Sequence, residues 1–170
     1  MKKISKAYVF DFDDVLIKDT AKSKLYNNGK FIKSLNADEY HHYTLQPGDK
    51  FDFSEFDNPT SINARPGPVW DLFVGLYKRN KNDLYILTAR TATVKPTMLK
   101  YLMANGINFN DLHVFCVGNP QMNPIKIPEK KENVLLELLP YYDEIIFYED
   151  NDLTVDRLKD IPGIYPILVK

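Results

Sequence analysis

Short, largely apolar runs alternate with helical patterns along this chain, and their order limits the fold more than any other feature. The runs stand at residues 7–10, 84–87, 113–117, 144–148 and 165–168. Apolar runs of this length suit parallel strands that are covered on both faces. Strands that alternate with helices imply right-handed crossovers. We therefore predict an α/β fold with a three-layer, Rossmann-like core and a mostly parallel sheet.

Helices are predicted in the intervals between these runs. Apolar residues recur at helical spacing over residues 69–77, 98–103 and 134–139. Asn105 and Gly106 are typical of a helix C-cap, and Pro140 ends the last of these patterns. A further short helix is expected before the last strand.

A different kind of segment, rich in polar and aromatic residues, occupies about residues 17–65. Within it, Asn28 and Gly29 separate two β-prone arms, which predicts a hairpin over residues 25–32. Asn36 is placed as the N-cap of a short helix through residue 43. We predict a single domain over residues 1–170, with this segment as a small cap insertion after the first strand.

Aromatic residues are frequent in the insertion. These rings could stack on a nucleobase and so bind substrate. Alternatively, they could pack together as a satellite core, a small hydrophobic core separate from that of the sheet. We favour the core, because a short insertion needs such residues to stay ordered. They are Tyr26, Phe31, Tyr40, Tyr43, Phe51, Phe53 and Phe56.

Composition excludes several other classes of protein. The 170 residues are 44% hydrophobic and 26% charged, which is ordinary for one globular domain. A formal net charge of -1 gives no global basic field for nucleic acid. Cys116 is the single cysteine, so an intrachain disulfide and a thiolate zinc cluster are excluded. We expect it in a buried strand.

The N-terminal segment is basic, but only four apolar residues precede Asp11. That run is too short for a signal peptide, and no stretch approaches a membrane span. The expected location is cytoplasmic.

Polar side chains follow the predicted strands at the points where the strands end. The carboxyl ends of parallel strands meet at one edge of a sheet, so these groups should come together. The candidates are Asp11 and Asp13 after the first strand, Thr88 and Arg90 after the second, Lys130 and Lys131 before the fourth, and Glu149, Asp150 and Asp152 after it.

Such a set suits phosphoryl transfer. One carboxylate can attack phosphorus, and a second can protonate the leaving oxygen and later activate water. Alternation along an extended segment places Asp11 and Asp13 on the same side. Carboxylate oxygens suit Mg²⁺, which offsets repulsion between clustered anions and a phosphate. A hydroxyl, an ammonium and Arg90 can hold phosphoryl oxygens.

The segment VFDFDDVL at residues 9–16, together with ILTAR at residues 86–90, a later lysine and a final acidic pair, resembles the haloacid dehalogenase-like (HAD) hydrolase superfamily. The resemblance implies that Asp11 is the nucleophile and a magnesium ligand. It implies that Asp13 is the general acid and base, with its backbone carbonyl on the metal. Thr88 and the lysine would then bind the phosphoryl group.

Two positions of this pattern are less specific. Lys130 and Lys131 both fit the lysine, and we favour Lys131 because the apolar stripe of its helix begins at Val134, three residues later. In the acidic pair we favour Asp150 as the metal ligand. Glu149 and Asp152 are left as supporting acids.

Simpler interpretations exist for single elements of the pattern. Thr88 alone could end a strand, and residues 149–152 could form an N-cap cluster at a helix start. His41 and His42 could contribute to a metal site, but no third ligand stands nearby in the sequence, so a surface pair is the better interpretation.

The resemblance is closest to compact HAD-type phosphatases of the kind often encoded by bacteriophages. It implies a magnesium-dependent phosphatase acting on a phosphorylated small molecule, a nucleotide or a nucleic-acid end. The alternatives are a phosphotransferase or phosphomutase, and a non-catalytic phosphate-binding regulatory module. We expect the hairpin over residues 25–32 to lie over the site and to set specificity.

Overall fold

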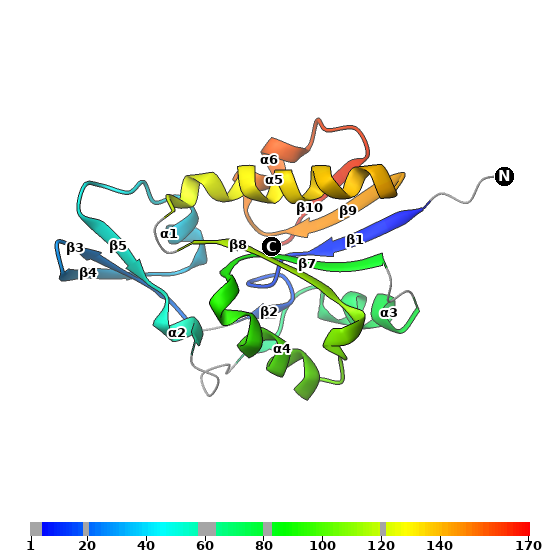
Figure 1. Cartoon of the computed structure of the whole chain (residues 1–170), viewed down its shortest axis with the longest axis horizontal. Coiled ribbons are helices and arrows are strands. Elements are labelled where there is room, and N and C mark those ends of the chain that lie inside the picture. Colours follow the sequence, from blue (N-terminus) through cyan, green and yellow to red (C-terminus); the bar gives the residue numbers. More distant parts are fainter. Residues whose placement is uncertain (1–4, 19–20, 58–63, 80–82, 120–121) are drawn as a thin grey trace.

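The computed structural model describes residues 5–18, 21–57, 64–79, 83–119 and 122–170. These residues form a five-stranded sheet in the order β10-β9-β1-β7-β8, in which every neighbouring pair is parallel (Figure 1). The predicted α/β class and mostly parallel sheet are thereby confirmed. The strands are β1 (Lys6–Phe10), β7 (Leu84–Thr91), β8 (His113–Gly118), β9 (Glu144–Glu149) and β10 (Ile164–Leu168).

The strand order reverses direction at β1. From β1 the chain moves to β7 and β8 on one side, and then crosses to β9 and β10 on the other. Adjacent crossovers therefore leave in opposite directions next to β1, which opens a crevice outside the carboxyl ends of β1 and β9. This point is where an open α/β sheet most often binds its ligand.

Helices cover both faces of the sheet (Figure 1). One face packs against α3 (Trp70–Arg79) and α4 (Lys95–Ala104) through a core that includes Phe10, Phe73 and Met98. The other face packs against α5 (Ile127–Leu138) and α6 (Asp152–Leu158) through Leu135, Phe147 and Leu158. Burial of both faces explains why the strands are apolar rather than alternating.

A two-stranded neck joins the insertion to the core. β2 (Ile17–Lys18) pairs antiparallel with β6 (Arg65–Pro66), so the chain enters and leaves the insertion at one place. Beyond the neck, an antiparallel sheet in the order β4-β3-β5 carries the short helices α1 and α2. These elements are β3 (Ser23–Asn27), β4 (Lys30–Leu35), α1 (Ala37–His41), β5 (Asp49–Asp52) and α2 (Ser54–Asp57).

The predicted hairpin is confirmed as the β3–β4 pair. Its two turn residues have positive φ, 47° at Asn28 and 80° at Gly29, as a type I′ turn requires. Asn36 is the N-cap of α1 as predicted, because it accepts from the Glu39 N–H at 2.8 Å while the Glu39 carboxylate accepts from the Asn36 N–H at 2.9 Å. This helix ends at His41, two residues earlier than predicted.

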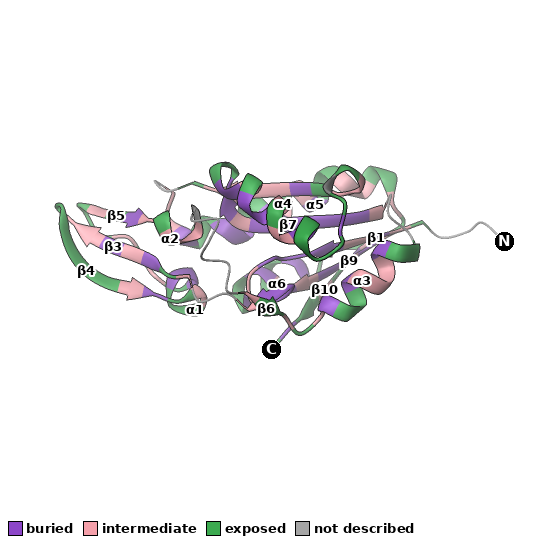
Figure 2. Ribbon diagram, turned by 90° about the horizontal axis from the view of Figure 1, so that it is seen from below, coloured by how far each residue is buried: buried purple, intermediate pink, exposed green. Residues whose placement is uncertain are grey.

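Four of the aromatic residues of the insertion form the satellite core that we favoured, while Phe56 packs against the main core. Tyr40 and Phe51 are buried with Leu25 and Leu35, and Tyr43 and Phe53 pack against them. Strand β4, at the edge of this sheet, is mostly exposed (Figure 2). Its outer position explains why Phe31 is exposed and takes no part in that core.

Some elements differ from the predictions. β5 and α2 were not predicted, because four-residue segments with mixed polarity give no periodic signal. Helix α5 begins at Ile127, seven residues before the apolar pattern from which it was predicted, so Lys130 and Lys131 lie inside the helix. Cys116 is half-buried rather than fully buried, because β8 is an edge strand. Its partial burial still raises the pKa of its thiol.

The 3₁₀ turns described are Ala92–Val94, Phe109–Asp111, Pro124–Lys126 and Leu139–Tyr141.

None of the helices that the structure describes is long and apolar enough to cross a membrane.

The neck is held by a close approach of Gly67 to the backbone at Val15 and Leu16. The Gly67 N–H donates to the Leu16 carbonyl at 2.8 Å, and the Val69 N–H donates to the Val15 carbonyl at 3.3 Å. A Cβ at Gly67 would lie 2.4 Å from the Val15 carbonyl oxygen and 2.7 Å from the Leu16 carbonyl carbon. Because both are backbone atoms beside Asp14, they cannot yield as a flexible side chain would.

We therefore predict that Gly67→Ala lowers the free energy of unfolding by roughly 1–3 kcal/mol through overpacking at the neck. Gly75→Ala is the matched control, because a Cβ at Gly75 on α3 meets nothing within 4 Å. That change should raise helix stability by up to about 1 kcal/mol. Urea unfolding of the two variants measures both effects, and equal stabilities would contradict the proposed steric cause.

Candidate active site at the carboxyl edge of the sheet

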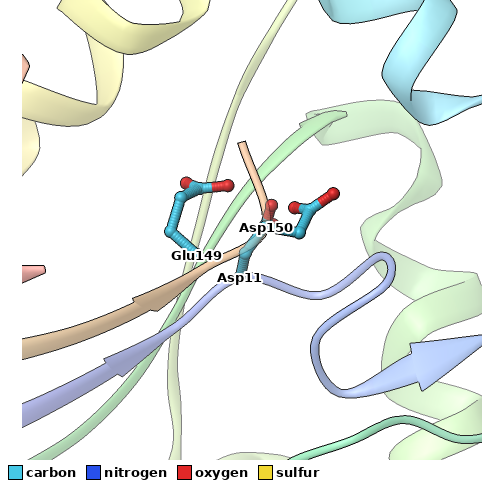
Figure 3. A group of neighbouring side chains, drawn as sticks. All are labelled: Asp11, Glu149 and Asp150. Atoms are coloured by element: carbon cyan, nitrogen blue, oxygen red, sulfur yellow. The ribbon is translucent and has the colours of Figure 1, made fainter. Parts of the chain in front are cut away.

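Acidic side chains lie where β1 and β9 end, at the reversal of the strand order. Asp11 directly follows β1, and Glu149 and Asp150 close β9. Figure 3 shows the three side chains at the ends of these neighbouring strands. One carboxylate oxygen from each lies within 4.8 Å of the others. Asp11 and Glu149 are buried, so their charges need partners.

Lys131 supplies that partner from α5. Its Nζ donates to Asp11 Oδ2 at 2.8 Å and to Glu149 Oε2 at 2.6 Å, and its side chain is fully buried. Burial alone would lower the Lys131 pKa, but the two carboxylates outweigh it and raise the pKa. Lys130 is exposed one residue earlier. Of the two candidate lysines, the structure therefore brings only Lys131 to this edge.

The remaining carboxylate oxygens differ in how they are bonded. Asp11 Oδ1 accepts from the Phe12 N–H at 2.6 Å, and Glu149 Oε1 accepts from the Asn151 N–H at 3.1 Å. Asp150 Oδ1 is buried and has no hydrogen-bond partner among the described residues. Burial, followed by the negative charge of Asp11, raises the pKa of Asp150 to about 7. Burial also raises the pKa of Glu149, although Lys131 opposes the shift.

This arrangement fits a hard divalent cation. Carboxylate oxygens are the donors that Mg²⁺ prefers, and the bare Asp150 oxygen is a buried acceptor that such an ion would satisfy. The predicted ligands were the carboxylates of Asp11 and Asp150 and the backbone carbonyl of Asp13. The structure groups Asp11 and Asp150 with the Glu149 carboxylate, and the Asp13 carboxylate is not part of that group.

Asp13 instead binds Arg90, which comes from the end of β7. Arg90 Nε donates to Asp13 Oδ2 at 2.9 Å, and its NH2 group donates to Asp13 Oδ1 at 2.7 Å. The guanidinium carbon also lies 5.1 Å from the Phe12 ring centre and 4.8 Å from that of Phe56. The two-pronged bond and the two rings hold Arg90 in one orientation at the site.

Thr88 lies at the same strand end but faces differently from the prediction. Its side chain is fully buried, and its Oγ1 accepts from the Arg90 N–H at 3.2 Å. Ala89, Arg90 and Thr91 line the cavity described below, and Thr88 does not. Its role in binding a phosphoryl group stays a prediction.

A cavity of about 620 Å³ lies over these groups. Its floor includes Asp11, Asp13 and Asp150 from the core edge, and its roof includes Tyr40, His41, Phe53 and Phe56 from the insertion. The expectation that the hairpin over residues 25–32 covers the site is wrong. The twisted cap sheet points away from the core, so the base of the insertion and α1 form the roof instead (Figure 1).

His41 is the cavity residue that sequence reasoning missed. It was placed in a surface pair, but it is 7% exposed, whereas His42 is exposed as expected. Burial lowers the pKa of His41 to about 4, and the charge of Lys131 adds to that shift. The sequence carried little signal for this, because the cavity is lined by Asn36, Ala37, Asp38, Tyr40 and His41, which do not share one helical face.

The polar residues that follow β9 cap helix α6 and contact the insertion. Asn151 is the N-cap of α6, because its Oδ1 accepts from the N–H groups of Leu153 at 2.9 Å and Thr154 at 3.3 Å. Asp152 is exposed, and its carboxylate lies 3.4 Å from Nε2 of His42 on the insertion. Asp152 therefore belongs to the contact between insertion and core, while its neighbour Asp150 faces the cavity.

Comparison of the chain with protein-family models, with curated proteins and with solved structures gave no match. The fold and the site together define an α/β protein with a carboxylate–lysine centre at the reversal point of a parallel sheet.

Removing the Lys131 charge should destabilise the protein strongly. Lys131→Met leaves Asp11 and Glu149 buried without their shared cation, which costs roughly 3–5 kcal/mol for a broken buried pair. Lys130→Met, the adjacent exposed control, should change stability by less than about 0.5 kcal/mol. Chemical denaturation measures both. A small effect at Lys131 would mean that the two carboxylates are protonated in the folded protein.

Stability of the metal-free protein should depend on pH through Asp150. Besides burial, Asp11 and Asp14 raise its pKa, whereas Lys131 and Glu149 lower it. Its pKa is about 7 in the folded state against 3.8 in the unfolded chain, so the folded state binds more protons in that interval. Stability therefore falls as pH rises from about 4 to about 7.

The Tm of the protein is measured at several pH values across this range, with a chelator present to remove metal ions. Asp150→Asn should flatten the slope and raise the Tm at about pH 8, because the uncharged amide removes the cost of a buried carboxylate. Mg²⁺ should raise the wild-type Tm more at about pH 8 than at about pH 5.5, because the cation competes with the proton. A wild-type Tm that rises from pH 5 to 7 in chelator would contradict this assignment.

Proposed function

We propose that this chain is a magnesium-dependent phosphatase of the HAD type, which hydrolyses a phosphomonoester through an aspartyl-phosphate at Asp11. The observation that carries the proposal is the placement of Asp11. It lies at the reversal point of the sheet, on the wall of the cavity, with Lys131 and Asp150 beside it. The resemblance of residues 9–16 to the first HAD motif supports the same assignment.

Asp11 has the setting that a nucleophile needs. The bonds from the Phe12 N–H to Oδ1 and from Lys131 to Oδ2 hold its carboxylate in one orientation. An oriented carboxylate can attack phosphorus without first losing rotational freedom, which lowers the entropic part of the barrier. Lys131 keeps its proton, since its pKa is raised, and so supplies a fixed positive charge at the reacting centre.

Asp11 and Asp150 would hold the magnesium ion, and the HAD resemblance adds the backbone carbonyl of Asp13. When bound, the ion would neutralise part of the negative charge on the phosphoryl group and the clustered carboxylates. The bare oxygen of Asp150 supports this role, and Glu149 would act through its bond to Lys131. Asp150 is then a ligand whose raised pKa makes cation binding depend on pH.

Asp13 would transfer protons, and Arg90 controls when it can do so. Both oxygens of Asp13 accept from Arg90, so both are engaged while this pair is closed. A phosphoryl group in the cavity offers Arg90 a second anionic partner of matching geometry. Movement of Arg90 toward the substrate would release Asp13, which could then take up a proton from solvent and pass it to the leaving oxygen. The carboxylate left behind could accept a proton from the water that attacks the aspartyl-phosphate.

Asp11→Asn is the direct test of the nucleophile. It keeps the volume but removes the attacking charge, so kcat on an aryl phosphate should fall by roughly 10³-fold or more. Phosphate release with Mg²⁺ measures the rate, and full activity in excess chelator would reject metal dependence. Borohydride treatment during turnover should convert the acyl phosphate at Asp11 to homoserine, which mass spectrometry detects.

The same assay separates hydrolysis from transfer. A phosphatase releases phosphate at a rate that an added acceptor sugar leaves unchanged, while a phosphotransferase or phosphomutase forms a phosphorylated sugar. Retention of near wild-type turnover by Asp11→Asn, with its Tm intact, would remove Asp11 from the nucleophile role.

A further inference from the structure

We propose that His41, which the insertion places in the cavity roof, binds the leaving group of a nucleoside monophosphate. This inference rests on the proposed phosphatase function and deepens it, because it assigns a residue to the part of the substrate beyond the phosphoryl group. His41 lies on the wall of the same cavity as Asp11, Asp13 and Asp150, but it comes from the cap rather than from the sheet.

The position of His41 is fixed by the packing of α1. Asn36 and Glu39 cap the helix by accepting hydrogen bonds from each other's backbone N–H. The Tyr40 ring packs edge-on against two rings, with centroid distances of 5.0 Å to Phe51 and 5.6 Å to Phe53. The helix also contacts the turn at Pro124–Lys126, which leads into α5 of the core. A side chain on the last turn of such a short, well-anchored helix meets a ligand without ordering a loop.

The two adjacent histidines are used differently. His42 Nδ1 lies 2.9 Å from the Asp38 carbonyl oxygen, and its Nε2 lies 3.4 Å from Asp152, so its ring is occupied by the contact between cap and core. His41 is 7% exposed, and its ring nitrogens form no hydrogen bond with a residue that the structure describes. His41 lines the cavity, so a ligand bound there can supply the partner that the imidazole lacks.

The chemistry of the roof indicates what that partner is. Tyr40, Phe53 and Phe56 present aromatic and apolar surface, and a neutral imidazole offers one N–H donor and one acceptor nitrogen. The matching leaving group has a flat ring and hydroxyl groups near the ester oxygen. A nucleoside combines both, and about 620 Å³ lies within the range of pockets for ligands of that size.

The test measures binding separately from turnover. The full chain with Asp11→Asn and Mg²⁺ is titrated calorimetrically with adenosine 5′-monophosphate, adenosine 3′-monophosphate and, as the minimal probe, phenyl phosphate. Adding His41→Ala should weaken the better-bound nucleotide about 10-fold or more beyond any loss for phenyl phosphate. His41→Asn, which keeps a donor and an acceptor, should recover part of that difference. His42→Asn, outside the cavity, should leave the ratio of the two affinities within about 2-fold.

A second readout follows the imidazole itself. The ring ¹⁵N signals of His41 should shift on nucleotide binding, and those of His42 should not. Equal losses for both probes in His41→Ala, no nucleotide binding, or unchanged His41 signals would each overturn the inference. Loss of the proposed phosphatase function would look different: no magnesium-dependent release from any ester, whatever residue stands at position 41.

Discussion

The buried contact of Lys131 with Asp11 and Glu149 is the interaction on which the site depends. It joins α5 to β1 and β9, the two strands that flank the reversal of strand order. Burying one ammonium between two carboxylates requires short bonds, here 2.8 Å to Asp11 and 2.6 Å to Glu149, and it leaves one negative charge in excess. The fold therefore tolerates an acidic cluster at this place because a helix on one face of the sheet delivers a cation to it.

The insertion completes the site from the other side. Its neck brings both connections together beside the loop that follows Asp11, so the cap sits over the carboxyl edge without becoming part of the core sheet. Contact between His42 and Asp152 joins its helix to the start of α6. The cavity thus has a floor built by the parallel sheet and a roof built by a separate small core, which can vary independently.

The features of the floor and the roof that have a local sequence signal were predictable, and those that depend on tertiary packing were not. Fully apolar strands such as residues 7–10 and the Asn28–Gly29 turn carry their own local signal, so the sheet class and the hairpin were predictable. The convergence of Asp11 and Asp150 followed from the rule that parallel strands end at one edge, and Lys131 was chosen over Lys130 by its place in the helical pattern. The Asp13–Arg90 pair and the burial of Thr88 depend on side-chain orientation at the strand ends, which no spacing specifies. His41 is buried because α1 packs against the core. Such packing between distant segments leaves little trace in the local sequence pattern.

The net negative charge of the carboxylate–lysine centre explains why the proposed reaction requires a divalent cation. Asp13 is paired with Arg90, and Asp14 with Lys18 at 3.0 Å, so neither adds much uncompensated charge. Asp11, Glu149 and an ionised Asp150 share only Lys131 and leave a formal charge of minus two. A phosphate dianion would be repelled by that charge, whereas one divalent cation cancels it. Burial, followed by repulsion from Asp11, raises the pKa of Asp150, and a proton on Asp150 relieves in the metal-free protein what a cation would otherwise relieve.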